Sequence, residues 1–224
     1  LVLSGKVTSF PVVRMNRQGK VLGTLAQLGR KNSMAAVPVG RTTHIFTQPV
    51  TANTLFALAP DGSSLIVVER PIPQQDGGST FAVSRIRSPQ GAVYARAYRY
   101  TAQPVPRRIA DSLFDAQVEG LTATGVGRAQ AERAIRSAIR IPAFQPPIAG
   151  VVVGMDGSAW LRKENLGSRR ADWLVLNPAG DVVATVGAPQ GLQILEVGRS
   201  AVWGVVHDDM DVPYVVRYRM QPAR

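Results

Sequence analysis

The strongest constraint on the fold is a glycine turn that recurs along the chain with strand-like sequence on both sides. Each copy combines a glycine with Asp, Asn or Pro, which favour tight turns, and a short run rich in Val, Leu, Ile or Tyr follows. Glycine adopts the positive φ angle that a tight hairpin requires. The pattern therefore predicts repeated antiparallel hairpins. The turns are Asn16–Gly19, Pro60–Ser63, Ser88–Gly91, Met155–Ser158 and Asn177–Gly180.

The runs that flank these turns predict strands in pairs. They are short and closely spaced, with Gly and Pro between them, which is typical of an all-β repeat protein. Three more strands follow the last pair. The predicted pairs are 9–16 with 20–26, 54–59 with 64–70, 80–87 with 92–100, 151–155 with 158–163 and 172–177 with 181–187, and the later strands are 192–197, 200–206 and 212–220.

The hairpins are of two kinds that alternate. An Asp-Gly hairpin at 58–70 resembles the one at 153–162, and a second kind at 86–94 resembles 176–183. Two alternating hairpins make a four-stranded meander, which is one blade of a β-propeller. The predicted fold is therefore all-β, a partial propeller of about three and a half blades. Residues 1–30 form the outer half of one blade, 49–100 a second, 148–187 a third and 190–220 most of a fourth.

One segment departs from this pattern, and we expect 104–147 to be a helical insertion between blades, packed on one rim of the ring. Apolar residues at helical spacing predict helices over 107–119 and 128–140, with Gly120 placed to end the first. Gly125–Gly127 is expected to start the second helix rather than bind phosphate, and Glu132 to pair with Arg136. The predicted apolar faces are Ile109, Leu113 and Ala116, and then Ala131, Ala134, Ile135, Ala138 and Ile139.

The composition excludes several kinds of site. The chain has no cysteine and only two histidines, His44 and His207, so disulfides, thiolate catalysis and Cys-type zinc sites are impossible. Any metal would need oxygen ligands, as Ca²⁺ and Mg²⁺ do. No apolar run is long enough for a membrane helix. We expect no cofactor, no transition metal and no catalytic triad.

The net charge of +11 is unevenly distributed, because residues 1–60 contain no Asp or Glu. A basic excess is compatible with binding to nucleic acid or another polyanion. Here most of the basic residues are scattered singly, at about strand-face spacing, without an aromatic stacking platform between them. Ordinary solvated strand faces are the favoured interpretation, and an anion-binding patch is the alternative.

Three segments resemble bacterial six-bladed β-propeller proteins of the NHL-repeat and TolB-like group: Asp156–Arg162, Val202–Asp209 and Val215–Arg219. The resemblance covers most of 49–220. It implies one propeller domain over 1–224 that is incomplete at its N-terminus, with about two further blades upstream, so we expect the chain to be a fragment. It also implies an exported protein, periplasmic or extracellular. Trp160, Trp203 and Tyr94 are expected to pack between blades.

Arg70 and Arg162 are the candidate binding residues. Both end second strands of their blades, a placement that suits a shared anionic ligand. Amphipathic strand ends with exposed charged groups are the favoured interpretation. His207, Asp208, Asp209 and Asp211 form an acidic group that is either a solvated loop or a cation site. By resemblance to propeller lactonases, Glu164, Asn165 and Asp156 offer oxygen ligands for an axial Ca²⁺.

These features lead to three hypotheses about function. The first is a non-enzymatic binding or scaffold propeller, whose partner is a protein or a small anionic ligand. The second is a hydrolase of the lactonase or esterase type with an axial calcium. The third is a protein that binds a polyanion or nucleic acid through its basic N-terminal blades. The absence of a recognisable catalytic motif favours the first.

Overall fold

The computed structural model describes residues 9–29, 33–87, 91–168 and 170–221. Within these residues the chain is mostly β-structure, in antiparallel sheets of two to four strands, and two helices interrupt it. The predicted all-β character is therefore confirmed, and both helices lie within the predicted insertion, 104–147.

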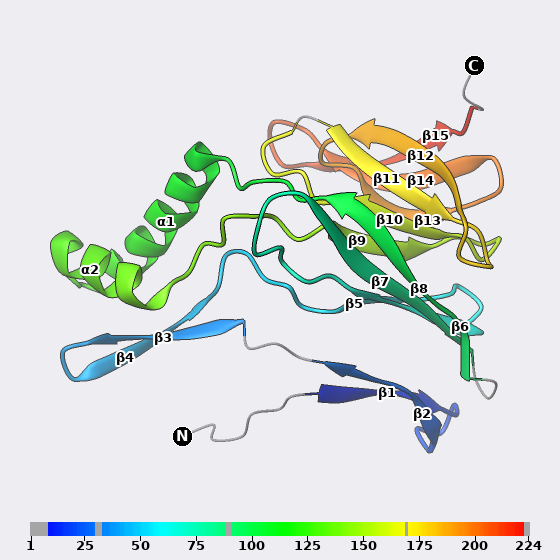
Figure 1. Cartoon of the computed structure of the whole chain (residues 1–224), viewed down its shortest axis with the longest axis horizontal. Helices are drawn as coiled ribbons and strands as arrows, with labels where there is room; N and C mark the ends of the chain where they lie inside the picture. The colour runs from blue at the N-terminus through cyan, green and yellow to red at the C-terminus, as the bar shows by residue number, and fades with distance from the viewer. Residues whose placement is uncertain (1–8, 30–32, 88–90, 169, 222–224) are drawn as a thin grey trace.

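Two of the sheets are four-stranded meanders in which every strand pairs with its neighbours in the chain. The first meander covers most of the predicted second blade and the second meander most of the third (Figure 1). The first meander consists of β5 (Leu55–Leu58), β6 (Ser64–Glu69), β7 (Gly78–Arg87) and β8 (Gly91–Thr101), and the second of β9 (Ile148–Val153), β10 (Ala159–Lys163), β11 (Arg170–Leu176) and β12 (Val182–Pro189).

The remaining sheets are smaller. A three-stranded sheet follows the second meander, and a two-stranded hairpin precedes the first. A further hairpin, which the sequence patterns did not predict, lies between residues 33 and 48. The three-stranded sheet consists of β13 (Gln193–Val197), β14 (Ala201–His207) and β15 (Pro213–Arg219); the hairpins are β1 (Ser9–Met15) with β2 (Val21–Gly29), and β3 (Met34–Val39) with β4 (Thr42–Thr47).

The recurring glycines occupy the turns for which they were predicted. Gly62 and Gly157 lie at equivalent places, each between the first and second strands of a meander. The backbone is left-handed at each of the five predicted positions, with φ of 81° at Gly19, 68° at Gly62, 81° at Gly91, 78° at Gly157 and 86° at Gly180. In the turn Ser88–Gly91, residues 88–90 lie outside the described part of the chain.

Apolar side chains between the sheets form the cores. Leu65–Val68 of β6 are all buried, because both faces of this strand are covered. One face contributes Ile66 and Val68 to the core shared with the second meander, and the other packs on the β1–β2 hairpin through Leu28. A further core joins the second meander to the three-stranded sheet. Full burial of a Leu or Ile side chain contributes about 1.5–3 kcal/mol.

The antiparallel order gives the two meanders two different ends. The turn end carries the glycine turns at 59–63, around Gly91, and at 154–158 and 177–181. The helix end carries the segments 48–54, 70–77, 102–147 and 164–168. In each meander the first strand begins at the helix end and the second strand ends there. Functional groups in these connections therefore lie at one end of both sheets.

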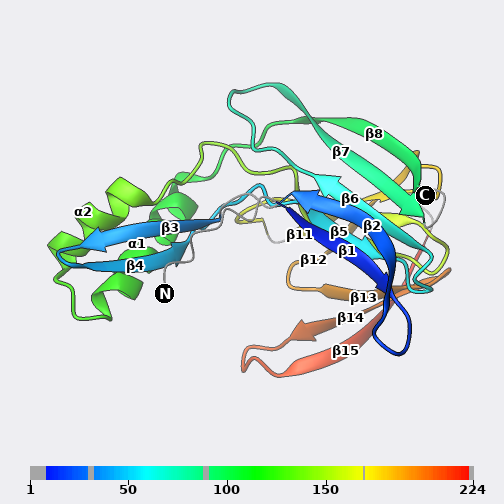
Figure 2. The ribbon, with the colours of Figure 1, turned by 90° about the horizontal axis from the view of Figure 1, so that it is seen from below.

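The two helices, α1 (Arg107–Thr122) and α2 (Arg128–Ala138), pack on the β3–β4 hairpin. Figures 1 and 2 show these four elements, the helical unit, to one side of the meanders. Its core includes Val37 of β3, Val118 of α1 and Ile135 of α2, each with no exposed surface. The insertion therefore packs on a hairpin from earlier in the chain. Neither helix is long and apolar enough, among the described residues, to cross a membrane.

Two local predictions for the helices were wrong. Gly120 does not end α1, which continues to Thr122 so that Leu121 is fully buried; a Cβ at Gly120 would lie 3.4 Å from the Phe46 ring. Gly120 thus permits close packing of α1 on β4. The predicted pairing of Glu132 with Arg136 does not form either, because Glu132 accepts a hydrogen bond from Arg128 at 3.0 Å. Arg136 instead lies 4.7 Å over the Phe114 ring. The predicted start of α2 after Gly127 is confirmed.

Candidate functional site

A cavity of about 390 Å³ opens at the helix end, where β7 and β8 of the first meander approach β10 and β11 of the second. Its apolar wall includes Phe81, Ile148 and Leu174, and the half-buried Tyr100 lies beside them. Its polar lining consists of Arg99, Thr101, Gln103, Gln145, Lys163, Glu164, Asn165 and Asp172. We call this site the polar cavity.

The wall of the polar cavity is fixed by a buried glutamine. Gln145 is 4% exposed, and its amide nitrogen donates to the Pro104 carbonyl at 2.7 Å. Its side-chain oxygen accepts from the Leu166 backbone N–H at 2.9 Å. These bonds join the segment before α1, the segment after α2 and the loop after β10. Gln145 thereby fixes one side of the cavity. The charged side chains of the lining take no part in these bonds.

The charged groups of the cavity are left largely without partners. Arg99, Lys163 and Asp172 make no hydrogen bond or ion pair with another described residue through their side chains. Asp172 is half-buried, where an unpaired carboxylate loses hydration without compensation. The fold therefore leaves donors and acceptors around this cavity available to a ligand.

Glu164 is a partly buried carboxylate at the helix end that interacts with two arginines. Burial raises the pKa of its carboxyl, and the charges of Arg162 and Arg70 and the Asn165 backbone N–H oppose that rise. Both arginines named as binding residues from the sequence therefore act on one carboxylate. Their positive charge is partly balanced by Glu164 before any ligand arrives.

Arg70 also has a structural role. Its Nε donates to the Asn53 carbonyl and its Nη1 to the Ile148 carbonyl, both at 2.8 Å. These bonds tie the end of β6 to the segment before β5 and to the first residue of β9. Burial lowers the pKa of Arg70. The side-chain oxygen of Asn53 is buried beside this tie and has no hydrogen-bond partner among the described residues.

Arg162 is not in the same register as Arg70. Arg162 lies within β10, opposite Gly150 of β9, whereas Arg70 follows the last residue of β6. An ideal Cβ on Gly150 would lie 3.7 Å from the Arg162 Nε, so the side chain crosses β9 at this small residue. The Arg162 side chain makes no hydrogen bond with another described residue. The two arginines thus meet through Glu164 rather than through equivalent positions.

The three oxygen ligands considered for calcium do not come together. Asp156 precedes β10 and Glu164 follows it, so a strand of five residues, about 16 Å long, separates them. Asp156 Oδ1 already accepts from the Ser158 N–H at 2.9 Å and from its hydroxyl at 2.6 Å. Asp156 therefore stabilises its turn. Two arginines act on Glu164, and their charge competes with that of a cation.

The acidic group near the C-terminus is a capped turn. Asp208 Oδ1 accepts from the Met210 and Val212 backbone N–H groups at 2.9 Å, and the Tyr214 hydroxyl donates to Oδ2 at 3.1 Å. These bonds lower the pKa of Asp208, the Val212 bond most of all. No three His, Asp or Glu side chains in the described part of the chain are grouped as metal ligands are. The solvated-loop interpretation fits Asp208 better than a cation site does.

Sequence reasoning missed a buried cation at the turn end. Arg85 of β7 is 4% exposed. Its Nε donates to the Ser64 hydroxyl at 3.1 Å, and its Nη1 donates to the carbonyls of Gly157 at 2.8 Å and Pro178 at 3.4 Å. Arg85 therefore joins the first meander to both glycine turns of the second. Alternation within β7, where Phe81, Val83 and Arg85 share the buried face, is the sequence signal that could have located it.

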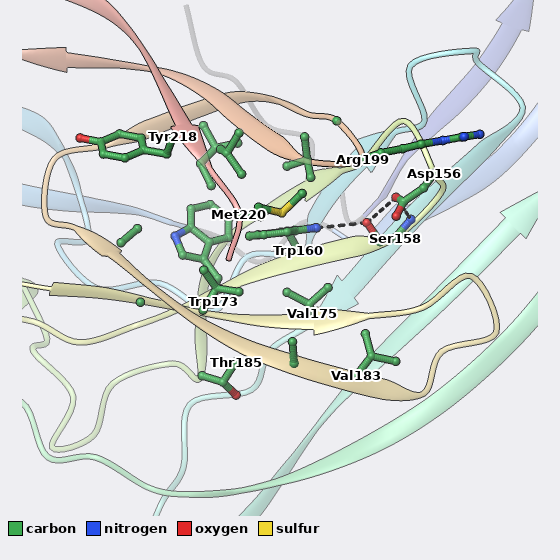
Figure 3. A pocket seen from close by; sticks show the side chains of 18 of the residues that line it. Asp156, Ser158, Trp160, Trp173, Val175, Val183, Thr185, Arg199, Tyr218 and Met220 are labelled. Atoms are coloured by element: carbon green, nitrogen blue, oxygen red, sulfur yellow. Dashed lines mark hydrogen bonds between the residues drawn. The ribbon is translucent and has the colours of Figure 1, made fainter. Parts of the chain in front are cut away.

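A larger cleft, of about 980 Å³, lies between the second meander and the three-stranded sheet (Figure 3). Its walls are mainly apolar. Trp160 donates to the Ser158 hydroxyl at 3.1 Å, whereas the buried indole nitrogen of Trp173 has no partner among the described residues. Tyr218 and Met220 line the other side. The three-stranded sheet has one strand fewer than each meander. It therefore covers less of β12, and the cleft lies along this less covered side.

The aromatic predictions were right for two residues of three. Trp160 and Tyr94 are buried between sheets, 3% and 9% exposed. Trp203 is 42% exposed, because it lies on the outer face of β14, where Arg217 stacks 5.5 Å from its ring.

The chain matches no protein-family model, and no curated protein matches it.

Proposed function

We propose that this chain is part of a β-propeller in an exported bacterial protein, and that it acts as a non-enzymatic binding or scaffold module. The order of the sheets supports the propeller. Consecutive meanders are joined at the helix end, and the first strand of the second meander, β9, contacts both β5 and β13. First strands that approach one another in this way are expected around a propeller axis. The six-bladed form and the location outside the cytoplasm rest on the sequence resemblance.

The polar cavity is the proposed binding site, and its unpaired charged side chains are the observation that carries this proposal. Groups that serve only the fold are normally paired when they are removed from water. Asp172 is half-buried without a partner, and the exposed Arg99 and Lys163 lie with it around a preformed hollow at the end that carries the helical unit. Ligand pockets commonly combine an apolar wall with a few polar groups in this way.

A fragment screen by saturation-transfer NMR tests this assignment. The cavity variant, Arg99→Gln with Asp172→Asn, removes one charge of each sign from the site. The control variant, Arg96→Gln with Asp181→Asn, removes the same residue types from an exposed salt bridge that also joins β8 to the second meander. We expect fragments that bind the wild type to bind the control variant and to lose binding to the cavity variant. Equal binding to both variants would place the site elsewhere.

The hydrolase hypothesis makes a contrary prediction that the same proteins test. A lactonase with a catalytic calcium would hydrolyse γ-lactones or aryl esters, and a chelator would abolish its activity. We expect no hydrolysis above that of the buffer, with or without Ca²⁺. Calcium-dependent turnover that Glu164→Gln removes would replace the binding proposal by the enzymatic one.

A further inference from the structure

We infer that the ligand of the polar cavity is a neutral carbohydrate, one or two sugar units in size. This inference rests on the proposed binding function and adds the chemical class of the ligand. Three properties of the cavity carry it: its charge balance, the kind of its polar groups and the position of its apolar wall.

The charge balance argues against a ligand with a large net charge. Arg99 and Lys163 provide two positive charges, and Glu164 and Asp172 provide two negative ones. Arg70 and Arg162 do not line the cavity, and Arg70 donates to two backbone carbonyls instead. Two carboxylates would repel a bound anion while two cations attract it, so the lining gives it no net attraction. A neutral ligand meets no such repulsion.

The polar groups suit a ligand with many hydroxyls. A hydroxyl donates one hydrogen bond and accepts two, so it is satisfied by carboxylates, amides and cations together. Asp172 and Glu164 accept, Arg99 and Lys163 donate, and Asn165 does both. Bonds between hydroxyls and charged side chains are stronger than those between neutral groups. Donors and acceptors contributed by β8, β10 and β11 thus surround the hollow.

The apolar wall provides a surface for the C–H face of a sugar ring. Tyr100 is half-buried, and its ring is held edge-on to Phe81 at a centroid distance of 5.9 Å. The half-buried Leu174 lies on the same wall, with the fully buried Ile148 behind it. A sugar has one polar edge and one less polar face, and the cavity offers surfaces of both kinds. A volume of about 390 Å³ is near the lower limit for ligand pockets, which sets the size of the ligand.

Isothermal titration with defined probes tests the inference on the full 224-residue chain. The probes are maltose, cellobiose and N-acetylglucosamine as neutral sugars, glucuronate as a sugar acid, citrate as a simple anion and glutamine as a zwitterion. We expect at least one of the three neutral sugars to bind, and glucuronate to bind no better than that sugar. Tyr100→Leu should weaken the binding of that sugar about tenfold, and the cavity variant should abolish it. The control variant, Arg96→Gln with Asp181→Asn, should bind as the wild type does.

The outcomes separate the ligand class from the binding function. Binding of citrate or glutamine in preference to every neutral sugar, lost in the cavity variant, would overturn the carbohydrate class and leave the cavity as a binding site. If fragments bind in the cavity while no sugar binds, the carbohydrate class is likewise wrong and the cavity is still a binding site. If neither fragments nor any probe bind, both proposals are wrong. If the cavity variant still binds the sugar, the sugar binds elsewhere on the chain, and the assignment of a carbohydrate to the polar cavity is wrong.

Discussion

The two ends of the meanders use polar residues in different ways. At the turn end, Arg85 is almost fully buried and its donors reach a hydroxyl and two carbonyls of neighbouring strands and turns. Asp156 is bonded within its own turn. At the helix end, the exposed Arg99 and Lys163 and the half-buried Asp172 surround a cavity, and their side chains have no hydrogen-bond or ion-pair partner among the described residues.

This difference indicates which residues serve the fold and which are available for function. A buried polar group is compatible with a stable fold when its hydrogen bonds are made internally, as they are for Arg85. Removing it leaves several acceptors without donors. An unpaired group beside a hollow contributes little to the folded state, so its removal should affect ligand binding rather than stability. Substitutions at the two ends should therefore separate these two effects.

The largest effect is expected for Arg85→Met. This substitution keeps most of the side-chain volume but leaves the Ser64 hydroxyl and the Gly157 and Pro178 carbonyls without their donor. We expect a loss of about 3 kcal/mol in the free energy of unfolding, measured by urea denaturation. Arg87→Met, at an exposed position of the same strand, is the control and should change it by less than about 0.5 kcal/mol. Equal losses for the two variants would show that the hydrogen bonds of Arg85 do not stabilise the contact between the sheets.

Gly180→Ala should have the next largest effect. The φ angle at Gly180 is 86°, and a Cβ there would lie 2.9 Å from the ring of Tyr94. Gly191 has nearly the same φ, 87°, but open space around it. We expect a loss of about 2 kcal/mol for Gly180→Ala and about 1 kcal/mol for Gly191→Ala in thermal unfolding. If the two losses agree, the contact between Tyr94 and the turn is not as described.

Arg70→Met and Arg162→Met should differ although both residues act on Glu164. Arg70 donates to two backbone carbonyls, so its loss should cost about 1.5 kcal/mol of stability. The Arg162 side chain makes no hydrogen bond with another described residue, so its loss should cost less than about 0.5 kcal/mol. Urea denaturation of both variants measures the difference. A larger cost for Arg162→Met would contradict the assignment of Arg70 as the structural member of the pair.

Glu164→Gln should have the smallest effect and should depend on pH. Burial raises the pKa of Glu164, so ionisation is less favourable in the folded chain than in the unfolded one. Wild-type stability therefore falls as the pH rises from the ordinary glutamate range through the raised pKa. The variant escapes this loss. We expect its melting temperature to exceed that of the wild type near pH 7 and to approach it below about pH 4. A lower melting temperature at pH 7 would show that the arginines outweigh burial.

Much of the strand pattern could be predicted from the sequence, because turn glycines and alternating apolar residues are local signals. Gly62, Gly157 and Gly180 mark their turns correctly. The β3–β4 hairpin was missed although Pro38 precedes Gly40 at the same spacing as Pro89 precedes Gly91; here the proline lies within β3, opposite Thr43, and not in the two-residue turn at Gly40 and Arg41. The end of α1 was also misplaced, because Gly120 is required for packing against Phe46 and not for a cap.

The candidate site was less predictable. Arg70 and Arg162 were found from strand ends, and both do lie near the helix end, but their shared dependence on Glu164 is a tertiary property. Asp172 and Arg99 lie 73 residues apart in the sequence, and only the packing of the two meanders brings them to one cavity. Local patterns contain no information about such a distant pair.

The free energy of unfolding of the Arg99→Gln, Asp172→Asn double variant tests the central claim most directly. The claim is that the charged groups of the polar cavity are not needed for the fold. We predict that urea denaturation gives a value within about 0.5 kcal/mol of the wild type, while ligand binding is lost. A loss of stability approaching the roughly 3 kcal/mol expected for Arg85→Met would contradict the account, because it would show that these residues, too, hold the sheets together.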